Sequence, residues 1–361
     1  MSSTELPKIP DLKVEDDFQT YKLGSFKLKS GVEIPDAFIA YKTLGDPSSP
    51  AIIYPTWYSG SISDNLWLTG SDKTLDPSKF YIIIPALFGN GQSSSPSNMP
   101  ELRPFPDVLI YDNVRAQYEL VTKHLGVSHA RAVLGWSMGA GQTYQWLTQY
   151  PDFMDIGVPF CGAAKTSLHN QVFLEGIKSA LYAAIGTSSA GVAKPDLRTA
   201  ENGGHSAFTP DQTKIGLKAL GRVYAFYRER LYEKAPTLGF KNLDDFLVNF
   251  WEAWALSNDP ENMLVMTHTW QAADCSEQEP YNGDFRSAME SIKAKTLVLP
   301  AKTDLYFPPE DSEIEVQNMK PGVGTFKVFP SIWGHWAGGP GQSTDDVKWL
   351  DEHLAEFIAK N

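Results

Sequence analysis

Short apolar runs that end at proline alternate with amphipathic stretches through the first 160 residues. Residues 51–55 and 81–85 are two such runs, rich in isoleucine, as is typical of strands buried on both faces of a parallel sheet. Residues 113–125 instead repeat apolar side chains at helical spacing. This alternation predicts an α/β fold whose mostly parallel central sheet is flanked by helices. The pattern predicts further strands at 130–134, 156–160, 294–300 and 326–329, and further helices at 138–150 and 345–359.

The pattern changes between residues 166 and 286. Strand-like runs disappear and helical spacing dominates, as in residues 213–232 and 243–255. The strand–helix alternation then resumes, so we predict one α/β core of residues 1–165 and 287–361 with 166–286 inserted as a helical cap. Aromatic side chains of the cap either pack its helices together or line an apolar acyl pocket: Phe246, Phe250, Trp251, Trp254 and Trp270.

A G-x-S-x-G motif lies between a predicted strand and a predicted helix. Its residues are Gly135, Ser137 and Gly139. This strand–turn–helix setting is that of a nucleophile elbow, where glycines flank the serine because the turn is too tight for side chains beside it. We predict that Ser137 is the nucleophile and that the backbone N–H of Met138 faces the developing oxyanion.

A serine hydroxyl needs a base to become a nucleophile, and in this fold the histidine comes last along the chain. Two histidines lie beyond the later strands. His353 falls inside the C-terminal amphipathic stretch, where a solvated surface residue is expected. His335 lies in a glycine-bracketed loop before that stretch, and we predict that it is the general base.

The acid of the triad is expected just after a strand between the serine and the histidine. Asp304 follows the apolar run 294–300 and meets this condition. Its role would be to fix the imidazole tautomer and to stabilise the imidazolium. Asp311 is the alternative, but it follows two prolines where a new helix is expected to begin, and a helix N-terminus accounts for an acidic residue there.

The second oxyanion donor is expected in the loop that follows an early strand. Residues 55–60 follow the strand predicted at 51–55. The backbone amide of Tyr58 is our first candidate in this loop, with that of Trp57 as the alternate.

Taken together, these segments resemble the homoserine O-acetyltransferase family of α/β-hydrolases, and the resemblance covers nearly the whole chain. It rests on residues 56–61, on 105–117, which lead into the helix before the elbow, on the elbow itself at 135–140, and on Gly334 and His335. The resemblance implies an acyl-enzyme on Ser137, a helical lid over the site, and often a dimer formed through that lid.

The departures from the family pattern concern the substrate. Family members that acylate homoserine have an aspartate directly after the histidine, where this chain has Trp336. The elbow has Trp136 in place of the usual glycine, residues 92–96 differ from the family's Gly-Ser-Thr-Gly-Pro stretch, and the oxyanion loop lacks its histidine. A buried ammonium group without a carboxylate is too costly, so homoserine is disfavoured. We expect Trp136 and Trp336 to line an apolar pocket suited to an uncharged ester or a larger hydrophobic acyl group.

Two activities remain open on this basis. The first is hydrolysis of a carboxylic ester or lactone with an apolar, small-molecule substrate. The alternative is an O-acyltransferase that moves an acyl group from acyl-CoA to an alcohol, because the two differ only in whether water or an alcohol resolves the acyl-enzyme. A ligand-binding protein that has lost catalysis is disfavoured by the complete triad.

The composition of the chain argues against nucleic-acid and membrane partners and against a secreted protein. The formal charge is −12, from 43 acidic and 31 basic residues, and no cluster of Lys or Arg would follow a phosphate backbone. No apolar run reaches 18 residues, and the polar N-terminus is unlike a signal peptide. Cys161 and Cys275 are too few for a disulfide framework or a four-cysteine zinc site, while His124 and His129 are expected at the surface. We therefore expect a cytoplasmic enzyme with no nucleic-acid or membrane partner and without a metal or other cofactor.

Overall fold

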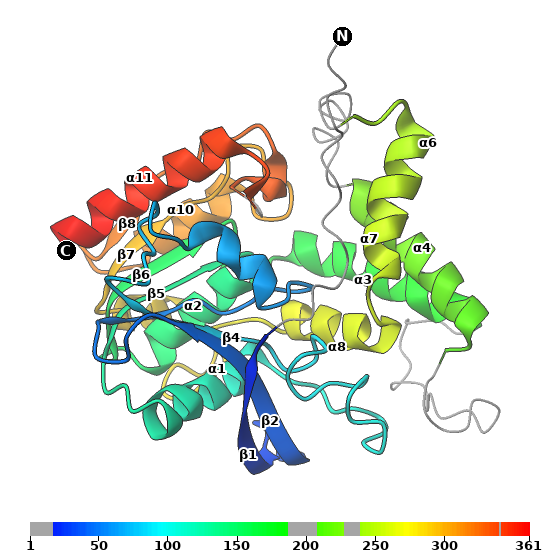
Figure 1. Ribbon diagram of the computed structural model, residues 1–361, viewed down its shortest axis with the longest axis horizontal. Coiled ribbons are helices and arrows are strands. Elements are labelled where there is room, and N and C mark those ends of the chain that lie inside the picture. Colours follow the sequence, from blue (N-terminus) through cyan, green and yellow to red (C-terminus); the bar gives the residue numbers. More distant parts are fainter. Residues whose placement is uncertain (1–16, 187–207, 227–238, 339–340) are drawn as a thin grey trace.

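The computed structural model describes residues 17–186, 208–226, 239–338 and 341–361 (Figure 1). Three parts of the sequence-based predictions lie outside these residues. They are the N-terminal stretch used against a signal peptide, residues 187–207 and 227–238 of the predicted cap, which include the end of the helix predicted at 213–232, and residues 339–340 after the histidine loop.

The described chain forms one eight-stranded sheet in the order β1-β2-β4-β3-β5-β6-β7-β8. Strands β3 to β8 run parallel, while β1 and β2 form an antiparallel hairpin and β2 pairs antiparallel with β4. The mostly parallel sheet is as predicted. The strands are β1 Gln19–Lys27, β2 Glu33–Leu44, β3 Ala51–Ile53, β4 Tyr81–Pro85, β5 Ala130–Trp136, β6 Met154–Phe160, β7 Lys295–Val298 and β8 Gly324–Phe326.

The β1–β2 hairpin was not predicted from the sequence. Most side chains of β1 are exposed, so the strand has no apolar run to reveal it. The last strand was predicted at 326–329 but ends at Phe326, with an isolated bridge between Ala301 and Phe329 continuing the pairing.

Neighbouring residues of the parallel strands face opposite layers of the molecule. Ile53 and Val133 belong to the hydrophobic cluster that includes Trp146 of α2. Ile52 and Leu134, one residue before or after them, belong to the cluster that includes α11. Because both faces are covered, successive positions in the central parts of these strands are apolar, as in Ile52–Ile53 and Val133–Leu134, which is why the run pattern identified them. Figure 1 shows α1 and α2 on one side of the sheet and α11 on the other.

The helices of the core lie close to their predicted positions. The helix predicted at 113–125 begins earlier, at Ile110, and its last turn, Leu120–His124, has π-type hydrogen bonding. The core helices are α1 Ile110–Glu119, α2 Met138–Gln149, α10 Pro309–Gln317 and α11 Thr344–Lys360, with short 3-10 turns at Ser63–Leu68 and Gly334–Trp336.

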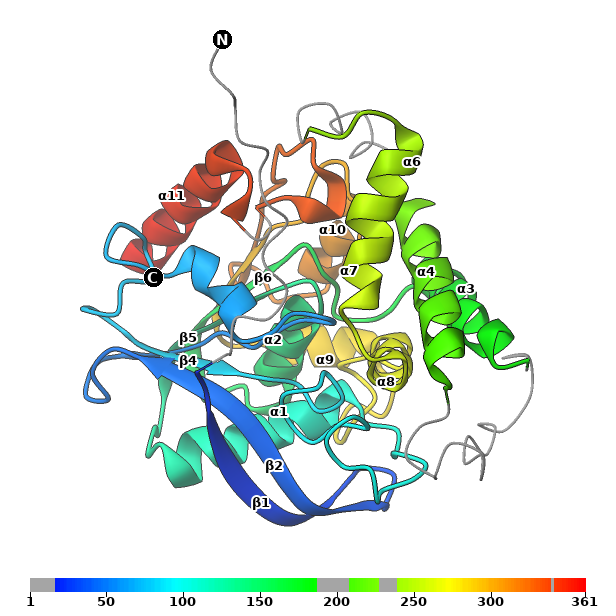
Figure 2. The same cartoon turned by 45° about the vertical axis from the view of Figure 1, so that its right-hand side comes forward.

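Between β6 and β7 the described chain is helical. Its helices are α3 Leu168–Ala184, α4 Pro210–Phe226, α6 Leu243–Phe246, α7 Ala253–Leu256, α8 Pro260–Gln271 and α9 Phe285–Ser291, with a π-type turn at Leu247–Glu252 that joins α6 to α7. Figures 1 and 2 show α3, α4, α6 and α7 grouped on one side of the molecule, with α8 between them and the sheet. The predicted cap boundary at residue 286 falls inside α9, which packs against α2 of the core. None of the helices in the described ranges is long and apolar enough to cross a membrane.

Candidate active site

Ser137 occupies a sharp turn between β5 and α2. Its backbone has φ 58° and ψ −124°, a conformation that non-glycine residues rarely adopt and that is found at functional sites. The turn depends on close approach of its neighbours. A Cβ at Gly135 would lie 2.3 Å from the carbonyl carbon of Gly139, and a Cβ at Gly162 would lie 2.4 Å from the Ser137 carbonyl oxygen. Gly162, two residues after the end of β6, was not identified from the sequence, because its constraint comes from a distant segment.

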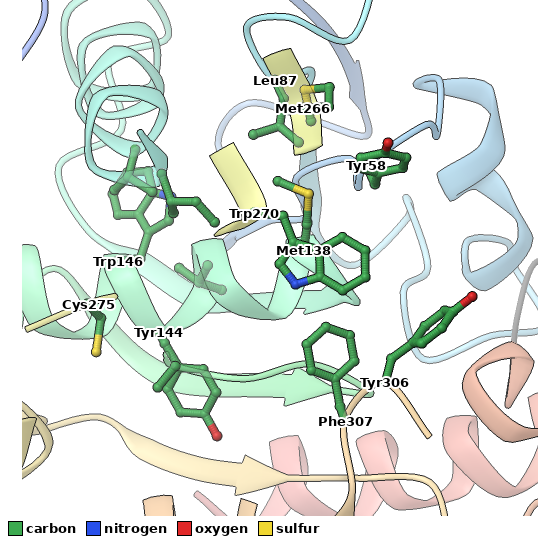
Figure 3. Close-up of a cluster of buried hydrophobic side chains, with 14 of the residues drawn as sticks. Tyr58, Leu87, Met138, Tyr144, Trp146, Met266, Trp270, Cys275, Tyr306 and Phe307 are labelled. Carbon is green, nitrogen blue, oxygen red and sulfur yellow. The ribbon is translucent and has the colours of Figure 1, made fainter. Parts of the chain in front are cut away.

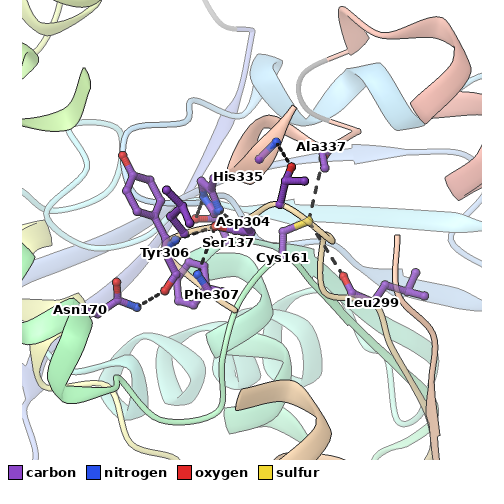
Figure 4. Close-up of polar contacts among 12 residues, drawn as sticks. Ser137, Cys161, Asn170, Leu299, Asp304, Tyr306, Phe307, His335 and Ala337 are labelled. Carbon is purple, nitrogen blue, oxygen red and sulfur yellow. Dashed lines mark hydrogen bonds and ion pairs between the residues drawn. The ribbon is translucent and has the colours of Figure 1, made fainter. Parts of the chain in front are cut away.

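Ser137, His335 and Asp304 form a hydrogen-bonded chain (Figure 4). The Ser137 Oγ lies 2.9 Å from the His335 Nε2, and the His335 Nδ1 lies 2.8 Å from the Asp304 Oδ2. All three residues are at most 4% exposed. The structure thus brings together three residues that are separated by 167 and 31 positions along the chain, and it does so in the order that the sequence predicts.

Backbone groups hold the Asp304 carboxylate in its orientation. Its Oδ1 accepts hydrogen bonds from the amides of Tyr306, at 2.8 Å, and Phe307, at 3.1 Å, which leaves Oδ2 for the imidazole. Thr303 links the acid loop to the histidine loop, because its Oγ1 accepts from the Gly334 amide at 2.9 Å. Asp311, the alternative acid, lies in the first turn of α10.

The two predicted oxyanion donors have free backbone amides. Within the part of the chain that the structure describes, the N–H groups of Met138 and Tyr58 donate to no protein acceptor. Two buried amide side chains hold the neighbouring carbonyls instead. Gln142 of α2 donates to the Thr56 carbonyl at 2.7 Å, and Asn65 donates to the Pro55 carbonyl at 3.1 Å. Neither side chain was identified from the sequence, because a lone buried amide has no motif.

The side chain of Tyr58 ties this loop to the cap. Its hydroxyl lies 2.8 Å from the Thr267 Oγ1 on α8. The Thr267 hydroxyl donates to the Met263 carbonyl at 2.7 Å, so the phenol is the donor toward Thr267. Tyr58 is 4% exposed, and burial raises its pKa to about 12. The phenol therefore remains a neutral donor at physiological pH.

The two tryptophans expected to line the pocket contact each other, and one of them stacks on the His335 ring. Trp136 is only 2% exposed and stacks on the His335 ring, with centroids 4.9 Å apart and planes at 21°. Trp57, the alternate oxyanion residue, meets Trp136 edge-on at 4.7 Å. Trp336 meets the far edge of Trp136 at 6.1 Å and donates its Nε1 to Gln342.

A buried cluster of large apolar side chains includes Met138, the residue directly after the nucleophile, together with Trp270 and Phe307 (Figure 3). Phe307 contacts the His335 ring at 5.3 Å, and Trp270 of α8 stacks on Phe307 at 5.5 Å. Met138 and Tyr306 belong to the same buried cluster. Of the five cap aromatics that the sequence singled out, Trp270 meets Phe307 and Tyr306 directly. Phe250 meets Trp336 at 6.0 Å, and Trp254 meets Tyr224, which in turn meets Tyr306. Phe246, Phe250, Trp251 and Trp254 also make ring contacts with one another.

The remaining candidate groups are not members of the hydrogen-bonded triad. Cys161 and Cys275 are buried free thiols, and burial raises the pKa of each. His124 and His129 are exposed, and His353 lies on α11 with its Nδ1 2.6 Å from the Trp349 carbonyl. The described residues contain no group of three or more His, Cys, Asp or Glu side chains arranged to hold a metal ion.

Comparison with known proteins identifies relatives that span the whole chain, although no family model matches it. A protein named as a probable esterase from Corynebacterium glutamicum is 31% identical over 96% of this chain and 97% of its own length. An ethyl acetate hydrolase from Pseudomonas veronii is 33% identical over 95% of both chains. The crystal structure of an acetylester hydrolase from C. glutamicum matches this fold with a TM-score of 0.83, covering 95% of this chain and 96% of that one.

The homoserine O-acetyltransferases are more distant relatives. The enzyme from Methanosalsum zhilinae is 27% identical over 86% of this chain and 67% of its own length. The chain therefore belongs to the family of α/β-hydrolase enzymes that contains these esterases, to which the homoserine O-acetyltransferases are related.

Proposed function

We propose that the protein hydrolyses carboxylic esters through an acyl-enzyme on Ser137. The observation behind this proposal is the unbroken hydrogen-bonded chain from the Ser137 Oγ through the His335 imidazole to the Asp304 carboxylate. Such a chain can remove the serine proton, hold the imidazole in one tautomer and stabilise the imidazolium. The esterase names of the relatives at 31% and 33% identity agree with this assignment.

In the first half-reaction, the Ser137 Oγ attacks the ester carbonyl carbon while its proton passes to the His335 Nε2. The carbonyl oxygen becomes an oxyanion that the amides of Met138 and Tyr58 would stabilise. The C–O bond to the leaving alcohol then breaks, and His335 returns the proton to that alkoxide oxygen. In the second half-reaction water attacks the acyl carbon and gives a proton to His335, which passes it back to Ser137 as the carboxylic acid leaves.

We propose that the acyl group is short. Large side chains that are at most 4% exposed already surround the nucleophile, among them Met138, Trp270 and Phe307. Each added methylene of a longer acyl chain would have to displace one of these packed rings. The structural relative that superposes on this chain is itself named as an acetylester hydrolase.

The surroundings of His335 favour an uncharged alcohol over an amino alcohol. The described rings in contact with the imidazole are Trp136, Tyr306 and Phe307, and the carboxylate bonded to it, Asp304, is already used by the triad. An acceptor that bears an ammonium group would lose its hydration there without gaining a partner. Hydrolysis of a neutral ester therefore fits the site better than acyl transfer to homoserine.

A chain-length series of p-nitrophenyl esters tests the proposal. We expect Ser137→Ala to abolish turnover, with kcat falling by roughly a million-fold. The wild type is expected to give an initial burst of nitrophenol and then steady turnover of the acetate ester in water, and kcat/KM is expected to fall about 10-fold or more per two added methylenes. Steady turnover by Ser137→Ala would refute the acyl-enzyme. A burst that stalls until an alcohol is added would instead identify an acyltransferase.

A further inference from the structure

The imidazole of His335 is held in its own plane by two hydrogen bonds, but they do not fix the ring against tilting. Three described rings contact it, and they do so differently. Tyr306 and Phe307 meet the imidazole at 55° and 44°. Trp136 lies nearly parallel to it, at 21° and 4.9 Å, and so covers one face of the ring.

Trp136 is fixed independently of any substrate. It is the last residue of β5, directly before the nucleophile, and it is 2% exposed. Trp57 packs edge-on against it at 82°, and Trp336 does so at 88°. An indole enclosed in this way cannot form much of an acyl-binding surface, in contrast to the pocket role that the sequence suggested.

The chemistry gives this stacked face a role. In both half-reactions His335 becomes a cation, and the negative face of an indole attracts a cation more strongly than any other aromatic side chain. The attraction is larger in a desolvated setting such as this one, where the imidazole is 4% exposed. Asp304 stabilises the same cation from the Nδ1 edge, so the two groups act on different sides of the ring.

We propose that Trp136 is a positioning residue for His335, which fixes the tilt of the imidazole and stabilises the imidazolium formed during ester cleavage. This inference rests on the proposed function, because it assigns the proton transfer to His335. It adds that the residue before the nucleophile acts on the base and not on the substrate.

Other titratable groups near the imidazole bear on any pH test. Asp304 is bonded to Nδ1, and the Tyr306 phenol belongs to a ring 4.9 Å away. The Cys161 thiol and the Asp346 carboxylate lie behind the histidine loop, where Cys161 contacts the Ala337 carbonyl and Asp346 accepts from the Gly338 amide. All four are retained in variants of Trp136, so a difference between those variants and the wild type reports the loss of the indole.

The test compares Trp136→Leu and Trp136→Phe with the wild type, using p-nitrophenyl acetate and butyrate across pH. For Trp136→Leu we expect kcat to fall about 5- to 30-fold with KM unchanged, because the stabilisation is realised only once the cation forms. The acidic limb of kcat/KM is expected to move to lower pH by about half a unit to one unit, because loss of the ring face disfavours the protonated imidazole. Trp136→Phe keeps an aromatic face and is expected to stay within about threefold of the wild type.

Two controls separate a specific effect on His335 from a general loss of packing or stability. Trp251→Leu removes another fully buried indole, which meets the rings of Phe246 and Trp254 and makes no described ring contact with the triad, and it matches the loss of packing. Thermal unfolding of every variant separates lost stability from lost activity. An unshifted acidic limb, or a changed preference for butyrate over acetate with altered KM, would overturn the positioning role. Turnover by Ser137→Ala in the same assays would instead overturn the proposed function itself.

Discussion

The triad end of the molecule and the cap are built by different kinds of contact. We define the triad end as residues 136–138, 301–307 and 331–338. There, polar atoms fix one another over short distances, as when the amides of Tyr306 and Phe307 orient the Asp304 carboxylate. In the described part of the predicted cap, residues 166–286, ring packing is added to hydrogen bonds on the side facing the site. Trp270 stacks on Phe307, while Asn170 donates to the Tyr306 carbonyl.

The difference matters because hydrogen bonds specify direction and ring packing specifies mainly volume. A triad needs atoms within a few tenths of an ångström, which directional bonds to a rigid backbone supply. A pocket needs a shape, and many combinations of large apolar side chains fill the same shape. We therefore expect substitutions at the triad end to affect kcat steeply and substitutions at the cap contacts to affect it gradually.

After the loss of the nucleophile in Ser137→Ala, the steepest effect is expected for Asp304→Asn. The asparagine oxygen can still accept from the Tyr306 and Phe307 amides, so the loop keeps its geometry. Its NH2 group then faces the His335 Nδ1 and forces the proton onto Nε2, where the base must be free. We expect kcat to fall roughly 10,000-fold. Asp311→Asn, at the start of α10, is the matched control and should leave kcat within about twofold. A large loss of kcat in Asp311→Asn with little loss in Asp304→Asn would identify Asp311 as the acid of the triad.

A smaller loss is expected for Gly162→Ala. The added Cβ would lie 2.4 Å from the Ser137 carbonyl oxygen and 2.5 Å from the Ala140 Cβ, so the elbow must shift. A displacement of about 1 Å at the nucleophile costs about 100-fold in kcat. The control is Gly141→Ala on the same elbow helix, whose nearest neighbour is the flexible end of Ile110 at 3.2 Å. Equal kcat in the two variants would mean that the added methyl group at Gly162 does not displace Ser137 enough to affect catalysis.

The sequence predicted those parts of the structure that require particular residue types at neighbouring positions. The elbow requires glycines around Ser137, and a strand buried on both faces requires an unbroken apolar run, so both could be recognised. The alternation of Ile52 and Ile53 between two layers follows from the same pattern. Asp304 and His335 were found because the order of the fold restricts where they can occur.

The parts that the sequence missed depend on partners far along the chain. Gly162 is required by Ser137, 25 residues away, and nothing beside Gly162 in the sequence records that contact. Gln142 orients Thr56 across the site, 86 residues apart. The orientation of Trp136 also depends on distant partners, because its stacking on His335 joins residues 199 positions apart.

The contact between the oxyanion loop and the cap tests whether substitutions at cap contacts lower kcat only moderately. Tyr58→Phe removes the hydroxyl that bonds to Thr267, and Thr267→Val removes the other partner with little change of shape. A single buried hydrogen bond contributes about 1 kcal/mol, so we expect kcat to fall about 5- to 10-fold in each variant.

The double variant distinguishes coupling from two separate effects. If the bond transmits the position of α8 to the oxyanion amide, Tyr58→Phe combined with Thr267→Val should lose no more than either single change. Losses that multiply would mean that the two side chains act separately. The mutant cycle is measured as kcat on p-nitrophenyl acetate together with thermal unfolding.

The smallest expected effect concerns pH and stability, at a buried carboxylate outside the triad. Glu315 of α10 accepts hydrogen bonds from the Tyr144 hydroxyl and the Ala164 amide, both at 2.6 Å. Burial raises the pKa of Glu315 to about 8. The unfolded chain, with a glutamate pKa of about 4.3, releases this proton much earlier, so between these two values the folded state holds the extra proton.

Stability must therefore fall as the pH rises from about 4.3 to about 8, and this contribution is complete only below the lower value. Glu315→Gln resembles the protonated side chain at every pH. Its melting temperature should match that of the wild type near pH 5 and exceed it near pH 8 by on the order of 5 °C. Subtracting the melting-temperature curves of the two proteins across pH cancels the contributions of the other titrating groups. Parallel curves would therefore show that the Glu315 carboxylate is already ionised in the folded protein. The contact between α10, α2 and the loop after β6 would then carry its negative charge at neutral pH.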